Sequence, residues 1–258
     1  MSTVGERDGK EFMASLAKGL AVLSAFSAGR PTMSLSEAAQ AAGLSRAAAR
    51  RVLLTLGALG YVEQNGRNFT LAPKILELGF AYLSIQSWIE RAEPLMRQLS
   101  TDVRAASNAA TLHGAEVVFV ARATAPSWLM APATPVGTRL PAFHTSLGRV
   151  LLGHLPQEDI WARLKATRIV QHTPYTIMDR AALVERVIAD REQGFSIVDE
   201  ELERGLRTLA VPVVSRAGAA IGAINLVARA GQTTRNEMRN RFLPPLQETA
   251  ARIAEGLA

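Results

Sequence analysis

The chain has 258 residues, among them 29 Lys and Arg, 23 Asp and Glu and no cysteine, and its net charge is +6. The lack of cysteine excludes disulfides, thiolate zinc sites and thiol catalysis, and no apolar run is long enough for a membrane helix. The positive charge favours polyanionic partners, and a hydrophobic content of 48% suffices for two modest domains. Residues 1–10 lack the apolar stretch of a signal peptide, so we expect a cytoplasmic protein with a loose N-terminal arm.

A first helix is predicted over about residues 15–26. Leu16, Leu20 and Leu23 recur on one side of it. We expect this leucine stripe to face inward and to brace the elements that follow.

Residues 34–60 predict two further helices joined by a tight turn. We expect Ser36 to cap the first and Ser45 to cap the second, because a serine hydroxyl accepts a free amide of the first turn. Gly43 suits a left-handed break between them, since it has no Cβ. The second helix carries one apolar face, which consists of Ala49, Val52, Leu53, Leu56 and Leu59.

The other side of this second helix is basic. Arg50 and Arg51 point outward with Ala47 between them on the helical wheel, Arg46 lies on the flank, and residues 45–60 contain no carboxylate. A short helix, a tight turn and a basic helix fit the major groove of DNA. The alternative is an ordinary helical hairpin with a solvated arginine face.

A β-hairpin is predicted directly after the basic helix. Residues 61–63 and 68–71 are strand-like and flank Asn65-Gly66, a strong signal for a tight turn. Such a hairpin forms a wing, and Arg67 near its tip can reach a phosphate or the minor groove. Residues 12–72 are therefore predicted to form a winged helix-turn-helix.

Two helices connect this region to a second domain. Pro73 is expected to begin a linker helix within residues 73–86, and a helix follows over about residues 88–103; together they form a rigid connector or a dimer seam. The remaining pattern mixes strands at 109–113, 116–122, 138–141, 195–199, 209–214 and 220–227 with helices at 145–154, 181–193 and 235–257. We therefore expect residues 87–258 to form an α+β domain with a mainly antiparallel sheet.

Several segments, in order, resemble the IclR-type transcriptional regulators over residues 12–257. They are Phe12–Leu20, the helix-turn-helix and wing, Arg139–Leu152, Gly194–Pro212 and Ala223–Val227. The motifs around Arg139 and Glu201 look like the branch that controls aromatic-acid catabolism by the β-ketoadipate route. The resemblance implies a GAF-like effector-binding domain, dimers or dimers of dimers on palindromic promoter DNA, and a small organic acid as effector, such as 4-hydroxybenzoate or protocatechuate.

The resemblance also implies positions for both sites. The DNA contacts would be Ser45, Arg46, Ala47, Arg50, Arg51 and Arg67. The effector pocket would include Phe143, His144, Thr145, Ser146, Asp199, Glu201, Arg207 and Asn225. Trp128 and Met130 would line the pocket or fill the core, and we favour the pocket. Branch members commonly carry paired arginines where this chain has Ser127–Met130, so the effector could be held differently or be a non-aromatic acid.

Several of these pocket residues could instead have a purely structural role. Thr145 either caps a helix or helps to bind an anion, and His144 is either a ligand partner or a satisfied structural histidine. Asn225 needs a partner only if it faces inward. The acidic run 199–203 suggests catalysis or a metal site, but the arginines after it favour a salt-bridged turn.

Three other classes of function are less well supported. No nucleophile elbow, phosphate loop or zinc-protease motif is present, the four histidines lack metal-ligand spacing, and only His144 and Ser146 resemble a hydrolase pair. We therefore expect no catalytic residues, metal or cofactor. An architectural DNA-binding protein would not need the second domain, and a ligand-binding module without DNA affinity would not need the arginine helix.

Overall fold

The computed structural model describes residues 12–124 and 135–255. Trp128 and Met130 thus lie outside the described residues. The chain divides into two compact units between Tyr82 and Leu83, and each unit is described by itself. Among the described residues, no helix is long and apolar enough to span a bilayer.

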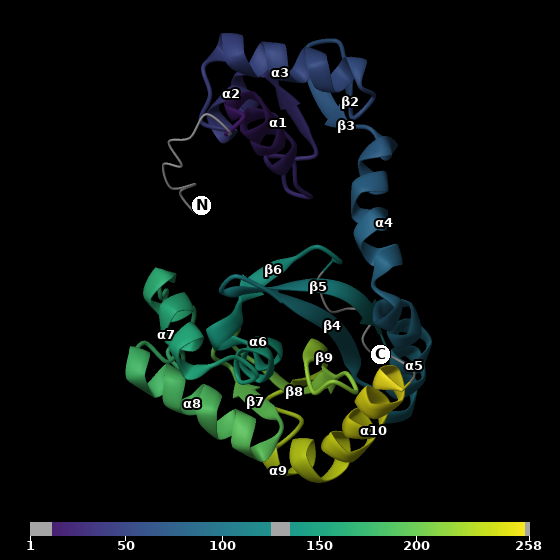
Figure 1. The fold of residues 1–258 in the computed structure, drawn as a ribbon, viewed down its shortest axis with the longest axis vertical. Helices are drawn as coiled ribbons and strands as arrows, with labels where there is room; N and C mark the ends of the chain where they lie inside the picture. The colour runs from purple at the N-terminus through teal and green to yellow at the C-terminus, as the bar shows by residue number, and fades with distance from the viewer. Residues whose placement is uncertain (1–11, 125–134, 256–258) are drawn as a thin grey trace. The chain divides into compact units, whose positions relative to one another are not determined.

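The N-terminal unit is a winged helix-turn-helix (Figure 1). Its elements are α1 (Ala14–Ser24), β1 (Thr32–Ser34), α2 (Leu35–Ala41), α3 (Arg46–Ala58), β2 (Val62–Asn65) and β3 (Asn68–Leu71). The strands form an antiparallel sheet in the order β1-β3-β2. A short 3-10 turn, Pro73–Ile75, then leads into α4, Leu76–Ile85. The predicted helices, wing and linker helix are thus present.

The caps of α2 and α3 follow from hydroxyl chemistry. Ser34, not the predicted Ser36, caps α2: its Oγ accepts the Glu37 amide at 3.4 Å, and the Glu37 carboxylate accepts the Ser34 amide at 2.7 Å. This reciprocal box requires the cap to stand three residues before the glutamate, which fixes the helix start. Ser45 caps α3 as predicted, with its Oγ 3.2 Å from the Ala48 amide. Gly43 takes the expected left-handed conformation, with φ of 65°.

The predicted inward leucine stripe of α1 is wrong for Leu16 and Leu20, whereas Leu23 is partly buried and packs against the core. Leu16 and Leu20 are 59% and 53% exposed, whereas Val22 and Phe26 are buried. Residues two apart on a helix point in nearly opposite directions, so a stripe through Val22 leaves Leu20 outside. The core of this unit consists of Val22, Phe26, Met33, Ala38, Leu53, Leu56, Val62 and Phe69.

The C-terminal unit is built on one six-stranded sheet (Figure 1). Its strands are β4 (Ala106–His113), β5 (Glu116–Ala123), β6 (Arg139–Pro141), β7 (Ser196–Asp199), β8 (Leu206–Val214) and β9 (Ala220–Arg229). Their order is β6-β5-β4-β9-β8-β7, and every neighbouring pair is antiparallel. The predicted α+β class with an antiparallel sheet is confirmed.

Helices cover both faces of this sheet. On one face, α5 (Ser87–Val103) and α10 (Leu243–Ala254) pack over a core that includes Met96 and Leu246. The other face carries α6 (Ser146–Leu152), α7 (Gln157–Ala166) and α8 (Arg180–Gln193). A short α9, Arg235–Glu237, and a π-helical turn, Met238–Phe242, precede α10. The sequence prediction missed α7, although acids in its first turn and bases in its last suit the helix dipole.

Candidate functional site

The predicted DNA-contacting side chains all lie on the surface of the N-terminal unit. Arg46, Arg50 and Arg51 are exposed on α3, as are Ser45 and Ala47. Arg67 is exposed beside the wing turn, where Gly66 has a φ of 63°. Among the described residues, none of these arginines has a carboxylate within ion-pair distance. Their charges are therefore available to phosphate groups.

The C-terminal unit contains a cavity of about 120 Å³ between the sheet and the start of α6. An engineered cavity of about 150 Å³ holds benzene, so this space matches one aromatic ring. The sheet lines it with Asn108, Phe119, Leu140, Val198, Leu206, Thr208, Asn225 and Val227. The opposite wall consists of His144, Thr145, Ser146 and Leu147, and the loop after β7 adds Glu201, Leu202 and Glu203.

A close backbone contact sets the position of the α6 wall. The Thr145 hydroxyl accepts the Gly148 amide at 3.1 Å and so caps α6. A Cβ at Gly148 would lie 2.1 Å from the Ala142 carbonyl oxygen, so no other residue fits without moving the backbone. Glycine at this position therefore lets the 3-10 turn Ala142–His144 pack directly on α6 and holds His144 at the cavity.

Two polar pairs mark the sheet side of the cavity. The Ser146 hydroxyl donates to the Thr208 hydroxyl oxygen at 2.8 Å. Asn225 faces Asn108 across β4 and β9, and its Oδ1 accepts both the backbone amide and the side-chain amide of Asn108, at 3.0 and 3.1 Å. Asn225 is thus the inward alternative of the two that the sequence left open.

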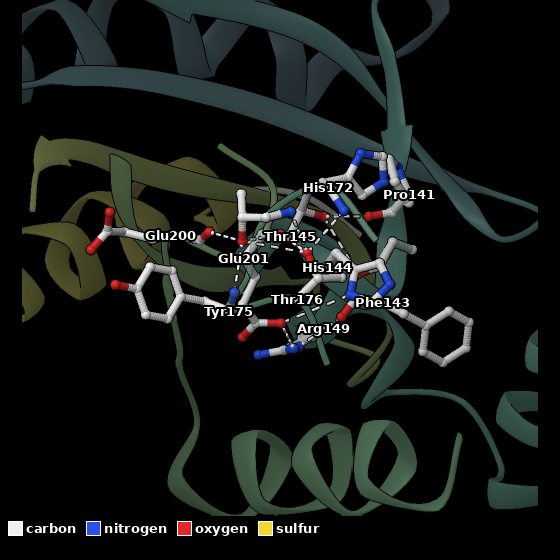
Figure 2. Close-up of polar contacts among 12 residues, drawn as sticks. Pro141, Phe143, His144, Thr145, Arg149, His172, Tyr175, Thr176, Glu200 and Glu201 are labelled. Carbon is white, nitrogen blue, oxygen red and sulfur yellow. Dashed lines mark hydrogen bonds and ion pairs between the residues drawn. The ribbon is translucent and has the colours of Figure 1, made fainter. Parts of the chain in front are cut away.

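A buried charged cluster stands behind the cavity wall (Figure 2). Arg149 is fully buried; its Nε donates to the Phe143 carbonyl oxygen at 2.8 Å, and its Nη2 lies 2.5 Å from Glu201 Oε2. His144 Nδ1 is 3.8 Å from the same Glu201 oxygen, and the His172 ring stands edge-on to His144 with centroids 6.2 Å apart. Neither His144 ring nitrogen has a hydrogen-bond partner in the described chain.

The cluster holds Glu201 in its ionised form. Burial is the largest single influence on its pKa and acts to raise it, but nearby His144 and the Arg149 guanidinium together outweigh burial. The pKa of Glu201 therefore lies below the ordinary 4.5. A carboxylate consequently remains at the cavity wall at neutral pH.

A threonine-rich turn fixes the loop that carries Glu201 (Figure 2). The Thr176 hydroxyl donates to the Glu201 carbonyl oxygen at 2.6 Å, and the Thr173 hydroxyl donates to the Glu200 carbonyl oxygen at 2.7 Å. Glu200 has a φ of 57°, and its carboxylate accepts the Gly205 amide at 2.7 Å. These bonds position the carboxylate of Glu201 against α6.

The structure brings some of the predicted effector residues together. His144, Thr145, Ser146, Glu201 and Asn225 line the cavity. Phe143 is fully buried in the core and lies outside the cavity lining. Asp199 and Arg207 form a two-pronged ion pair with both bonds at 2.9 Å, also outside the lining.

Sequence reasoning missed most of the cavity wall and the arginine behind it. Arg149 is the basic residue of an otherwise uncharged helix, Ser-Leu-Gly-Arg-Val-Leu-Leu, in which every residue is buried. A charge inside a largely apolar run was the available signal that this arginine has a buried partner. No group of three described His, Asp or Glu side chains could hold a metal ion.

Comparisons with known proteins agree with this architecture. Residues 15–66 match the model of the IclR helix-turn-helix domain, and residues 80–255 match that of the bacterial transcriptional regulator IclR C-terminal domain. The Pca regulon regulatory protein of Pseudomonas putida is 38% identical, over 92% of this chain and 81% of its own length. The p-hydroxybenzoate hydroxylase transcriptional activator of Acinetobacter baylyi is 34% identical, over 93% of this chain and 90% of its own.

Two solved structures extend the likeness. A transcriptional regulator from Rhodococcus sp. RHA1 superposes with a TM-score of 0.83 and 39% identity, over 95% of this chain and 98% of that one. The second is the inducer-binding domain of the PobR transcription factor from Acinetobacter, a double mutant in complex with 3-hydroxybenzoic acid. It superposes with a TM-score of 0.58 and 31% identity, over 62% of this chain and 93% of that one. The chain therefore belongs to the IclR family of bacterial transcriptional regulators.

Proposed function

We propose that α3 and the wing read promoter DNA and that an aromatic carboxylic acid in the cavity controls promoter activity. The functional segments are then residues 12–72 for DNA, 73–86 as linker and 87–258 for the effector. Such a regulator acts in the cytoplasm, where bacterial promoters are. The DNA contacts are Ser45, Arg46, Ala47, Arg50, Arg51 and Arg67, whose exposure supports the assignment.

The ring-sized cavity carries the effector assignment. Apolar side chains such as Phe119, Leu140 and Val227 enclose it, and a few polar groups, including His144 and Asn225, meet there. This combination suits a flat apolar ligand with polar substituents at its edge. One relative is named for a p-hydroxybenzoate hydroxylase, and a related domain is in complex with 3-hydroxybenzoic acid; 4-hydroxybenzoate and protocatechuate are therefore the first candidates.

We further propose that two copies bind a palindromic operator. Exposed apolar side chains of the kind that a second copy would cover are Phe12, Met13, Leu16 and Leu20 at α1, and Leu76, Leu78 and Phe80 on α4. Exposed apolar side chains that are grouped on helices are typical of interaction surfaces, and a twofold dimer on a twofold operator is the usual arrangement for helix-turn-helix proteins. A pair of such dimers is the tetramer that the sequence resemblance implies.

A thermal-shift panel of acids tests the effector class. The panel contains 4-hydroxybenzoate, 3-hydroxybenzoate, protocatechuate, β-ketoadipate and pyruvate. A ligand at about a hundred times its Kd adds roughly 2.7 kcal/mol of stability, which raises Tm by about 5–10 °C for a domain of this size. A shift with aromatic acids alone supports the proposal. A shift with an aliphatic acid alone, or with none of them, overturns the aromatic assignment.

A further inference from the structure

The charges that line the cavity are unsuited to an anion as they stand. Glu201 and Glu203 are the acidic residues of the described lining, and His144 is its one basic residue. Residues 125–134, which lie outside the described structure, contain no Lys or Arg in the sequence. A carboxylate that enters therefore meets two carboxylates and finds no guanidinium or ammonium among the described lining residues.

The arginine behind the wall, Arg149, is paired with Glu201, although its Nη1 has no hydrogen-bond partner in the described chain. Arg149 donates to the Phe143 carbonyl oxygen and to Glu201 Oε2, and its side chain is fully buried behind the wall. Its charge is balanced by Glu201 at 2.5 Å. The transfer of an unbalanced carboxylate from water into such a site is very costly, so another positive charge must accompany the ligand.

His144 is placed to supply that charge. Its ring is 2% exposed and lines the cavity, and in the described chain neither ring nitrogen has a hydrogen-bond partner. Buried polar groups are seldom left unpaired. With Glu201 3.8 Å from Nδ1, a protonated ring would lie between two anions, Glu201 and a ligand carboxylate.

Other charged groups around this ring do not replace it. Glu203 shares the cavity wall, His172 stands 6.2 Å away on the segment before α8, and Arg149 lies behind Glu201. The side chains that the sheet presents to the cavity are uncharged, namely Asn108, Phe119, Leu140, Val198, Leu206, Thr208, Asn225 and Val227.

We propose that an anionic aromatic effector binds together with one proton, which His144 holds between the effector carboxylate and Glu201. This inference rests on the proposed function and specifies how its site recognises charge. The proton completes the neutralisation that an arginine would otherwise provide. Affinity for the acid then falls as pH rises, by at most about tenfold per pH unit, because one proton is linked to binding.

Titration calorimetry of the full chain with 4-hydroxybenzoate tests this proton uptake. Binding heats are measured in two buffers of different ionisation enthalpy, from about pH 6 to pH 8.5, where the phenol remains protonated. The slope of heat against buffer enthalpy gives the number of protons bound. We expect a value that approaches one proton in the upper part of this pH range. The neutral isostere 4-hydroxybenzamide is expected to bind with no uptake.

Substitutions assign the proton to a residue. His144→Gln is expected to abolish the proton uptake. It is also expected to lower the affinity for 4-hydroxybenzoate more than the affinity for 4-hydroxybenzamide. His113→Gln, at the exposed end of β4, and His172→Gln, beside the cavity, are expected to retain the uptake. His144→Asn serves if the glutamine variant does not fold, and binding of the amide shows that the cavity is intact in either variant.

Two results would overturn the proposal. One is wild-type binding of 4-hydroxybenzoate with an uptake below about 0.1 proton at every pH. The other is an undiminished uptake in a folded His144 variant, which would assign the proton to Glu203 or to the ligand itself. If no aromatic acid binds, the proposed function is refuted as well. If an aromatic acid binds without proton uptake, only the proton linkage is refuted.

Discussion

The Arg149 guanidinium and the Glu201 carboxylate form a buried ion pair, with Nη2 and Oε2 2.5 Å apart. Arg149 comes from α6 and Glu201 from the loop after β7, so the pair joins two walls of the cavity. A buried pair of this kind contributes little net stability, because both charges lose their hydration. Removal of one partner alone is costly, since the other charge remains buried and unbalanced.

A double-mutant cycle should reveal this asymmetry. We expect Arg149→Met to lower the free energy of unfolding by about 3–5 kcal/mol, because Glu201 is then buried without a counter-ion. Adding Glu201→Gln should restore most of that loss, since no charge then remains buried. Urea unfolding of the single and double variants measures the coupling. Losses that simply add would show that the two side chains act independently.

The stability that Glu201 contributes should disappear in acid. Its pKa is lowered in the folded protein, so the contribution is present above the unfolded value, here 4.5, and is lost as pH falls through the folded value. The difference in Tm between wild type and Glu201→Gln should therefore shrink from about pH 5 towards pH 3. A difference that grows in this range would contradict the pKa direction.

The comparison of wild type with Glu201→Gln also separates the pH effect of Glu201 from that of a second buried acid, Asp190. Asp190 on α8 accepts the Ser196 hydroxyl at 2.6 Å, and burial raises its pKa above the ordinary 3.8. A raised carboxyl pKa has the opposite sign, with stability lost as pH rises from the unfolded to the folded value. Because Asp190 is present in both proteins, its effect largely cancels from the difference.

Arg50 should contribute to DNA affinity but not to folding. Arg50→Ala removes an exposed α3 charge, so we expect weaker binding and a salt dependence, log K against log salt, that is shallower by about one. Tm should remain within about 1 °C, as for most surface substitutions. Gel retardation with a DNA fragment selected from a random pool by the wild-type protein measures the affinity.

Arg216→Ala is the matched control for Arg50. Arg216 is also exposed but lies in the other unit, on the turn between β8 and β9. The Arg216→Ala variant should bind DNA with the same affinity as the wild-type protein. Equal affinity of the Arg50 variant and wild type would remove α3 from the proposed interface.

Two helix ends offer a pair of opposite stability changes. Arg104 ends α5 in a left-handed conformation with φ of 56°, and Gly194 ends α8 with φ of 78°. The left-handed region is strained for residues with a Cβ. We expect Arg104→Gly to stabilise the protein by about 1 kcal/mol and Gly194→Ala to destabilise it by a similar amount. Denaturant midpoints measure both, and shifts of the same sign would contradict this account.

The local signals of the sequence were sufficient for much of the fold. Strand-like runs indicated the principal sheet strands, and the Ser45 cap and the Asn65-Gly66 turn helped to identify the winged helix-turn-helix. Leu16 and Leu20 were misplaced because an apolar stripe has the same pattern whether it faces a core or another protein. Hydrophobic spacing reports which side of a helix is apolar, and it does not report what covers that side.

The cavity depends on pairings between distant residues, which one sequence does not reveal. Asn225 could be placed inward only once its partner Asn108, 117 positions away, was known. Arg149 stands in a largely apolar run, but its partner Glu201, 52 positions further on, is known only from the fold. Family resemblance supplied His144 and Ser146, but no local pattern distinguished them from Phe143, which is buried in the core.

The contact at Gly148 limits how this cavity can be reshaped. Because the backbone of α6 lies directly on Ala142, with no room for even a methyl group, the wall that carries Thr145 and Ser146 cannot move outward to admit a bulkier acid. Space for a second ring or a longer side chain has to come from the sheet, by shortening side chains such as Phe119, Leu140 or Val227. Divergence of ligand size among proteins that keep this glycine is therefore expected at strand positions, while the helix end continues to set the position of the polar groups.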